Sequence, residues 1–193
     1  SYGWWRKVML RFLFLVALLL PCAHSGAQFP GVDSAAQREA MRPLAVMHGQ
    51  WLGQGRRYRP DGERYDFTQT LEIRPEADGL ITTIAGQSLR QLEALEDRRT
   101  LRPGTGSFAV VMYDEAAGDY LFRSFGFGTL VEARAEFIRD RVFRWVVAGP
   151  VMLRFTIDLT EDGVWEELGE RSSDGGVTWK PTNRLTAYRV EAR

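Results

Sequence analysis

Cysteine and histidine are almost absent from this chain. Its 193 residues include one cysteine, Cys22, and two histidines, His24 and His48. A single cysteine excludes an internal disulfide. His24 lies in the segment that is interpreted below as a signal peptide, which leaves His48. One histidine without an Asp or Glu cluster at ligand spacing is a poor basis for a metal site, so we expect no metal site. A Ser-His-Asp catalytic set is likewise excluded everywhere except at His48.

An excess of charge of one sign is also missing. The 25 basic and 25 acidic residues cancel, which gives no reason to expect a nucleic acid as a partner. The hydrophobic fraction of 45% is ordinary for a globular protein and is sufficient for one domain with a core.

The apolar run "FLFLVALLL" at residues 12–20 is well short of the ~20 residues that span a bilayer. It follows a basic start and is ended by Pro21. This arrangement predicts a secretory signal peptide over residues 1–27, with no stable membrane insertion after cleavage. The basic residues before and within this segment are Arg6, Lys7 and Arg11.

Cleavage is expected after Ala27, with Ser25 at the −3 position. Met9 looks like the natural start, so residues 1–8 are interpreted as upstream or vector-derived. Cleavage would remove three basic residues and no acidic ones, leaving a net charge of −3 and no cysteine. We therefore expect a periplasmic or secreted protein. The alternative is a lipoprotein anchored at Cys22, although Pro21 is an unusual residue before a lipidated cysteine.

Residues 28–42 are predicted to form a lead-in with a helix, and residues 43–193 a single domain. Ser34 and Gln37 fit a capping box, with Asp33 as an alternative cap. Pro43 fits the first turn of a second short helix over residues 43–48, which Gly49 would end.

The rest of the chain shows strand signals separated by close turns, and no helix period of useful length. About ten strands are expected, which favours an antiparallel sheet closed into a barrel or folded into a sandwich. The segments are 50–59, 64–73, 79–87, 107–114, 119–128, 129–138, 141–148, 151–159, 164–172 and 177–190, with 88–101 ambiguous between a strand and a short helix.

Gly49, Trp51, Gly53 and Gly55 alternate through the first strand. Glycine weakens strands, but it allows sharp coiling and the close approach of a neighbour, as closure of a small barrel requires. A large aromatic such as Trp51 can plug the closed end of such a barrel.

The segment "HGQWLGQGRRYRPDGERYDFTQTLEI" resembles the opening of nitrobindin-like barrels of the calycin superfamily. The segment "GVWEELGERSSDGGVTWKPTNRLTAYR" resembles an uncharacterised family of secreted bacterial lipocalin-like proteins. Together the resemblance covers most of residues 42–190. It implies an all-β fold, a single calycin-like up-and-down antiparallel β-barrel with a short N-terminal helix. It also implies that Arg184 or Arg189 stacks on Trp51.

Nitrobindins bind haem through a histidine on a late strand, and this chain departs from that pattern. No histidine follows His48. Tyr188 is a conceivable axial ligand, but a tyrosine near a chain end is more often a packing residue. We therefore expect no haem and no other cofactor.

The stretch "SSDGGVTW", residues 172–179, matches the Asp-box pattern of sialidase propellers. A propeller needs several copies and a longer chain, so this single copy is interpreted as a hairpin. In that hairpin Asp174 binds turn amides, Gly175 adopts a positive φ and Trp179 packs back on the strands.

Candidate catalytic residues are few. Glu166 and Glu167 face opposite ways along a strand, and the face with Glu166 is expected to be solvated. The other face contains Glu167 and Arg171, which could place a Glu–Arg pair inside the barrel. His48 is a third candidate, as a general base, although contact with helix-terminal carbonyls is its simpler role.

Charged residues on one strand face indicate that the other face points inward. This rule predicts an aromatic interior that includes Tyr65, Phe67, Leu71, Phe137, Leu153 and Ile157. The alternative is a filled core without a cavity. The candidate ligand-binding residues are Gln69, Arg123, Phe143, Trp145 and Phe155.

The sequence therefore predicts a barrel that binds a small apolar or amphipathic molecule. The alternatives are an isomerase, cyclase or hydrolase that acts inside the barrel, and an interaction module that uses its outer strands. The oligomeric state stays open.

Overall fold

The computed structural model describes residues 34–90, 102–126 and 128–191. The predicted signal peptide, its cleavage site and Cys22 lie outside these residues, as does most of the ambiguous segment 88–101. The domain treated below is the compact unit that runs from Asp33 to Arg193.

An α-helix, α2 (Ser34–Met41), continues into a 3₁₀ helix, η1 (Arg42–Met47). Pro43 sits in the first turn of η1, where its missing N–H costs nothing. Met41, Leu44 and Met47 are buried. Within the described part of the chain, no helix is long and apolar enough to cross a membrane.

The side chain of Gln37, which was predicted to form a capping box with Ser34, reaches the barrel. Its Nε2 donates to the backbone oxygen of Tyr113, 2.7 Å away. The Tyr120 hydroxyl donates to the oxygen of Ala40, also at 2.7 Å. These two hydrogen bonds join α2 to the ends of two strands.

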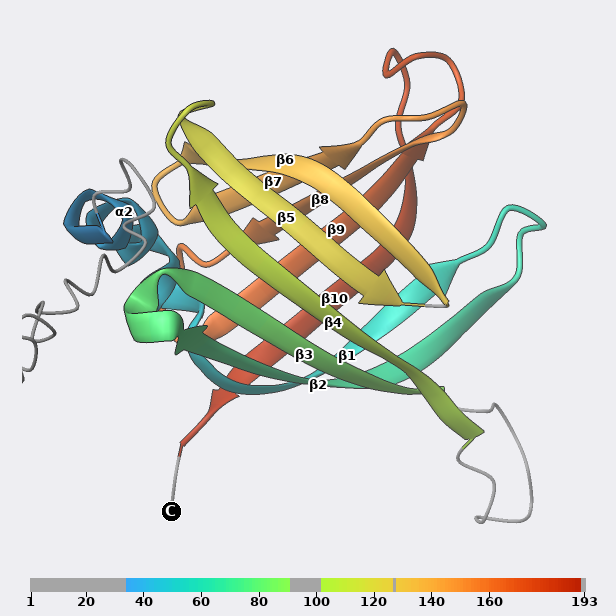
Figure 1. Cartoon of the computed structure of the whole chain (residues 1–193). Helices are drawn as coiled ribbons and strands as arrows, with labels where there is room; N and C mark the ends of the chain where they lie inside the picture. The colour runs from blue at the N-terminus through green and yellow to red at the C-terminus, as the bar shows by residue number, and fades with distance from the viewer. Residues whose placement is uncertain (1–33, 91–101, 127, 192–193) are drawn as a thin grey trace, which may run out of the picture. The chain divides into compact units, whose positions relative to one another are not determined.

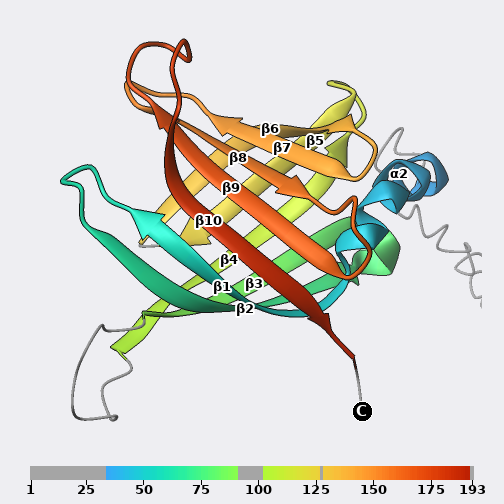
Figure 2. The same ribbon diagram turned by 180° about the vertical axis from the view of Figure 1, so that it is seen from behind.

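Ten strands form a closed antiparallel barrel in which each strand pairs with its neighbours in sequence and the last pairs with the first (Figures 1 and 2). This confirms the predicted fold class. The strands are β1 (Gly49–Tyr58), β2 (Arg64–Glu76), β3 (Ile81–Arg90), β4 (Arg102–Asp114), β5 (Asp119–Gly126), β6 (Thr129–Arg139), β7 (Val142–Val147), β8 (Met152–Asp158), β9 (Val164–Ser172) and β10 (Lys180–Val190), with a short 3₁₀ turn, η2 (Ala77–Gly79), between β2 and β3.

Trp51 lies in the core next to η1, with 1% of its surface exposed. Its indole Nε1 donates to the Met47 oxygen at 2.9 Å, and its ring meets Trp165 edge to face at 5.6 Å. The Arg189 guanidinium lies 4.3 Å from the ring centre and also donates to the backbone oxygens of Val46 and His48. Arg189, and not Arg184, therefore joins η1, Trp51 and β10.

The glycines of β1 leave room for neighbouring chain. A Cβ added to Gly53 would lie 2.3 Å from the Thr186 oxygen and 2.5 Å from the Ala187 Cα. A Cβ added to Gly55 would lie 2.4 Å from Cζ of Phe67. Glycine is therefore required here because β10 and the Phe67 ring occupy the space that a side chain needs.

The β9–β10 connection is an Asp-centred turn. Asp174 accepts hydrogen bonds from the hydroxyl groups of Ser172 and Thr178 and from the backbone N–H groups of Thr178 and Val177, and these bonds, in that order, hold its pKa below the ordinary range. Gly175 has a φ of +74°, and Trp179 Nε1 donates to the Gly176 oxygen at 2.9 Å. All of these contacts are local to the hairpin.

Candidate functional site

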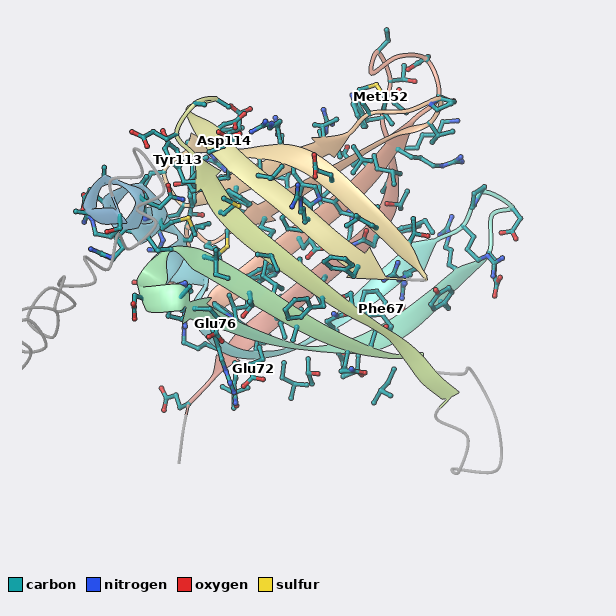
Figure 3. The ribbon with its side chains drawn as sticks, in the orientation of Figure 1. Phe67, Glu72, Glu76, Tyr113, Asp114 and Met152 are labelled. Carbon is teal, nitrogen blue, oxygen red and sulfur yellow. The ribbon has the colours of Figure 1, made fainter. Side chains whose placement is uncertain are left out.

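A cavity of about 310 Å³ lies inside the barrel. Figure 3 shows Tyr113 beside α2 and Phe67 toward the other end of the barrel. Most of the cavity wall is apolar. Its apolar residues are Leu71, Ile84, Ala109, Phe122, Val131, Trp145, Val147, Leu153, Phe155, Ile157 and Trp165, and its polar side chains are Arg57, Gln69, Ser107, Ser124 and Glu167.

Three stacked aromatic rings form one side of the cavity. Trp145 lies 4.4 Å from Phe122 and 5.1 Å from Phe155 between ring centres, with interplanar angles of 19° and 15°. The three rings come from β7, β5 and β8, so the stack joins the neighbouring strands β7 and β8 and reaches across β6 to β5. This wall is a rigid apolar surface, because Trp145 is already stacked between the other two rings.

Phe143 does not reach the cavity as predicted. It is completely buried, and it packs against Tyr120 and Phe137 at ring-centre distances of 5.6 and 5.0 Å. Its position on β7 nearer α2 places it in the filled part of the barrel. Phe143 therefore belongs to the core below the cavity.

Two polar side chains meet over a glycine on the cavity wall. A Cβ at Gly86 would lie 2.7 Å from the Ser107 Oγ and 2.8 Å from the Gln69 Nε2. Gln69 is thus brought to the cavity, where the sequence predicted it, and Ser107 accompanies it from β4.

Glu167 points from β9 into the same cavity and keeps partial exposure there. The Asn183 Nδ2 donates to its Oε1 at 3.0 Å. Asn183 is buried on β10, opposite Gly169, and a Cβ at Gly169 would lie only 1.9 Å from the Asn183 Oδ1. Gly169 therefore provides the space in which Asn183 reaches the carboxyl group.

Burial raises the pKa of Glu167 above its ordinary value. The hydrogen bond from Asn183, the neighbouring Trp165 N–H and the positive charge of Arg57 act in the opposite direction, and burial outweighs them. A carboxyl group whose pKa is raised by folding binds its proton more tightly in the folded state. Stability then falls as the pH rises from the ordinary value of 4.5 through the raised value.

Glu167→Gln is therefore expected to raise the free energy of unfolding at neutral pH, by on the order of 1 kcal/mol, because glutamine keeps the shape and loses the charge. The gain should vanish near pH ~4, where Glu167 is protonated in both states. Urea unfolding at the two pH values measures this. Glu166→Gln on the outer face is the matched control, and a destabilised Glu167→Gln variant at neutral pH would contradict the sign.

Arg123 was assigned to the interior, and this assignment is wrong. Its Nε donates to the Glu132 carboxylate at 2.7 Å, and 51% of its side chain is exposed. Strand alternation explains the error, because Phe122 and Ser124 on either side of it face the cavity. The cation at the cavity is Arg57, whose guanidinium lies 5.2 Å from the centre of the Phe67 ring.

The three catalytic candidates are not brought together. Glu167 faces the cavity, whereas Arg171 is half-buried nearer the end of β9 and does not line it. His48 lies at the end of η1, and its Nε2 is 3.2 Å from the Thr82 Oγ1. Burial, reinforced by the charge of Arg189, lowers the pKa of His48. The predicted Glu167–Arg171 pair is therefore replaced by Glu167 and Arg57.

Tyr188 is 60% exposed on the outer face of β10, so its hydroxyl is not available to a group inside the barrel. Over residues 34–89, 106–126 and 128–191, no three His, Cys, Asp or Glu side chains gather in a way that could hold a metal ion. The chemistry of the interior rests on Glu167 and its neighbours.

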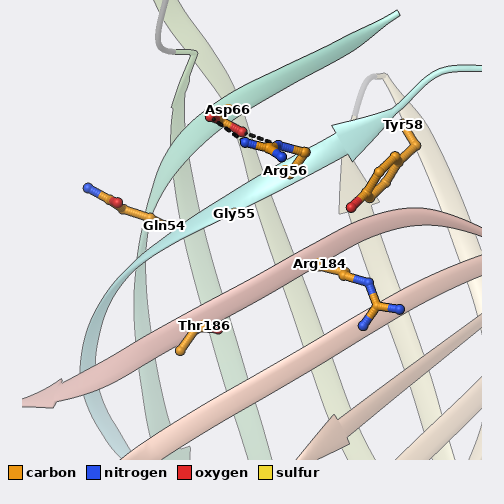
Figure 4. Close-up of a pocket in the computed structure, with 7 residues that line it drawn as sticks. All are labelled: Gln54, Gly55, Arg56, Tyr58, Asp66, Arg184 and Thr186. Carbon is orange, nitrogen blue, oxygen red and sulfur yellow. Dashed lines mark hydrogen bonds and ion pairs between the residues drawn. The ribbon is translucent and has the colours of Figure 1, made fainter. Parts of the chain in front are cut away.

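A second hollow, of about 300 Å³, lies on the outer side of β1 and β10 (Figure 4). It contains the ion pair between Arg56 and Asp66, with a shortest separation of 2.6 Å, and both side chains are about half exposed. Arg184 lines this hollow on the outside of the barrel, which explains why it does not stack on Trp51. The polar, open character of this hollow makes the interior cavity the better candidate site.

Comparison with known proteins supports the fold alone. No protein-family profile matches the chain, and no curated protein matches it in sequence. The crystal structure of Rv2717c from M. tuberculosis aligns with a TM-score of 0.54 and 10% identity, over 79% of this chain and 98% of that one. The S-type phycobiliprotein lyase CPES from Guillardia theta aligns with a TM-score of 0.52 and 9% identity, over 84% of this chain and 100% of that one. The resemblance expected from the two ends of the sequence is thus confirmed at the level of the fold, a calycin-like β-barrel.

Proposed function

We propose that this barrel binds a small, partly apolar molecule in its interior cavity. The observation that supports this most strongly is the cavity itself, about 310 Å³ with an aromatic wall and a few polar side chains. Ligand sites in proteins have this composition and begin at about this size. A barrel built only for stability would fill this space, because empty volume forfeits packing energy.

The fold by itself does not decide between binding and catalysis. One structural neighbour is described as a phycobiliprotein lyase, and the same architecture supports unrelated activities. In this chain the candidate catalytic residues His48 and Arg171 do not reach Glu167 across the cavity. This separation of the candidate catalytic residues favours binding over catalysis.

Filling the cavity tests the proposal. Val131 on β6 lines the cavity, and Leu130 beside it is 56% exposed on the outer face. Val131→Trp is expected to weaken binding of the neutral fluorescent probe aminoanthracene at least about tenfold, because the added ring occupies the site. Leu130→Trp places the same ring outside and should change the affinity less than about twofold.

A fluorescence titration of the three proteins measures this, after thermal unfolding has shown that both variants fold. Equal weakening by the two tryptophans would indicate an outer binding surface. If the unaltered protein does not bind the probe at all, the proposal is wrong.

A further inference from the structure

The Trp165 side chain, which lines the cavity, has a buried hydrogen-bond donor without a partner in the described part of the chain. Trp165 is 1% exposed and lines the cavity wall. Its Nε1 is buried and has no hydrogen-bond partner within the described residues. Trp51, its partner in the core, instead donates to the Met47 oxygen. A buried donor without an acceptor is costly and uncommon, so an acceptor atom at this point of the cavity would be stabilised.

An acceptor lies next to this donor. Glu167 follows Trp165 by two residues on β9, so the two side chains are on the same face of the strand, and both line the cavity. Asn183 donates to the Glu167 Oε1. An ionised carboxylate has about four lone-pair positions, so Glu167 can accept further hydrogen bonds. The cavity thus has a donor and an acceptor side by side in a mostly apolar wall.

The charges around this pair disfavour an ionised ligand. A carboxylate on the ligand would meet the carboxyl group of Glu167 in a low-dielectric interior, where like charges repel strongly. A cationic ligand would meet Arg57, which lines the same cavity and already lowers the pKa of Glu167 through its charge. Because the wall has one charge of each sign, an ionised group is attracted by one and repelled by the other, and it still loses its hydration on entering the cavity. An uncharged polar group loses much less hydration.

We propose that the polar end of the ligand is an uncharged group that carries an acceptor and a donor together, as a primary amide or an alcohol does, held between Trp165 Nε1 and Glu167. The acceptor atom receives the indole N–H, and the ligand N–H or O–H donates to the carboxyl group. This inference rests on the proposed function and specifies the chemical class of its ligand.

A series of ligands with one apolar body tests the proposal. Naphthalene, naphthamide, naphthol, naphthoate and naphthylmethylammonium would be compared at neutral pH by displacement of aminoanthracene. We expect naphthamide and naphthol to bind at least about tenfold more tightly than naphthalene, because they satisfy the donor and the acceptor. Naphthoate and naphthylmethylammonium should bind no more tightly than naphthalene.

Two variants with matched controls locate the effect. Trp165→Phe keeps an aromatic ring and removes the donor, so it should abolish most of the advantage of naphthamide and leave naphthalene binding within about threefold. Trp179→Phe removes an indole N–H in the β9–β10 hairpin and should leave the order of affinities unchanged. Glu167→Gln removes the charge and should bring naphthoate closer to naphthamide, whereas Glu166→Gln on the outer face should not.

The outcomes separate the two proposals. If naphthalene binds as tightly as naphthamide, or naphthoate binds most tightly, the ligand class is wrong and cavity binding stands. If no member of the series binds and aminoanthracene does not bind either, the proposed function is wrong, and this inference falls with it. If Trp165→Phe does not fold, the charge preference measured with Glu167→Gln decides, and an unchanged preference contradicts the proposal.

Discussion

Replacing Trp51 with alanine is expected to lower the free energy of unfolding by about 3–5 kcal/mol, the range for large aromatic side chains removed from a core. Trp51 is almost fully buried, and its loss would remove three different contacts. The edge-to-face contact with Trp165, the hydrogen bond to the Met47 oxygen and the stacking of Arg189 would all disappear. The closed end of the barrel depends on this side chain because it joins η1, β1 and β10.

Urea unfolding followed by circular dichroism measures the effect. Trp179→Ala provides a control, because Trp179 is only half-buried in the β9–β10 hairpin and should cost markedly less. A loss below about 1 kcal/mol for Trp51→Ala would show that Trp51 does not support the closed end.

Gly53→Ala is expected to lower the free energy of unfolding by at least about 1–3 kcal/mol, the usual cost of overpacking a core. The added methyl group would overlap the backbone of β10 at Thr186 and Ala187, and backbone cannot rotate away as a side chain can. The two strands would have to move apart where Gly53 pairs with Ala187.

Gly126→Ala is the matched control for this substitution. Gly126 also lies in a strand, and a Cβ there would be in ordinary contact, 3.7 Å from Cβ of Ser107. Thermal unfolding of the two variants should therefore show a large decrease for Gly53→Ala and little change for Gly126→Ala. Equal melting temperatures would mean that β1 and β10 are not held as closely as described.

Strand alternation made most of the fold predictable from the sequence. The charged residues Glu132, Arg134 and Glu136 fixed the outer face of β6 and placed Ala133 and Ala135 inside, where both are buried. The same argument placed Trp145 and Phe155 on the cavity wall. It works because the side-chain period of a strand is two, so one charged face determines the other.

The polar side chains of the candidate site were harder to predict from strand alternation. Asn183 reaches Glu167 only because Gly169 leaves the space between them, a contact set by pairing of β9 with β10 that is not visible in either segment alone. Arg57 is on the same face of β1 as Trp51, so alternation from Trp51 would have placed it inside and its neighbour Arg56 outside, but the prediction did not use this signal. Arg123 was wrongly placed inside the barrel because strand alternation was not applied to β5. Its neighbours Phe122 and Ser124 face the cavity, so Arg123 faces outward.

The indole N–H signals of an ¹⁵N-labelled protein report directly on whether a ligand enters the cavity. Titration with naphthamide is expected to shift the Trp145 and Trp165 signals, since both side chains line the cavity. The signals of Trp51 and Trp179, whose N–H groups donate to Met47 and Gly176, should stay in place. Tryptophan-to-phenylalanine variants assign these four signals among those of the six tryptophans in the chain. Saturable shifts confined to Trp145 and Trp165 are the result that we expect, and saturable shifts of Trp179 with Trp145 and Trp165 unchanged would contradict binding inside the barrel.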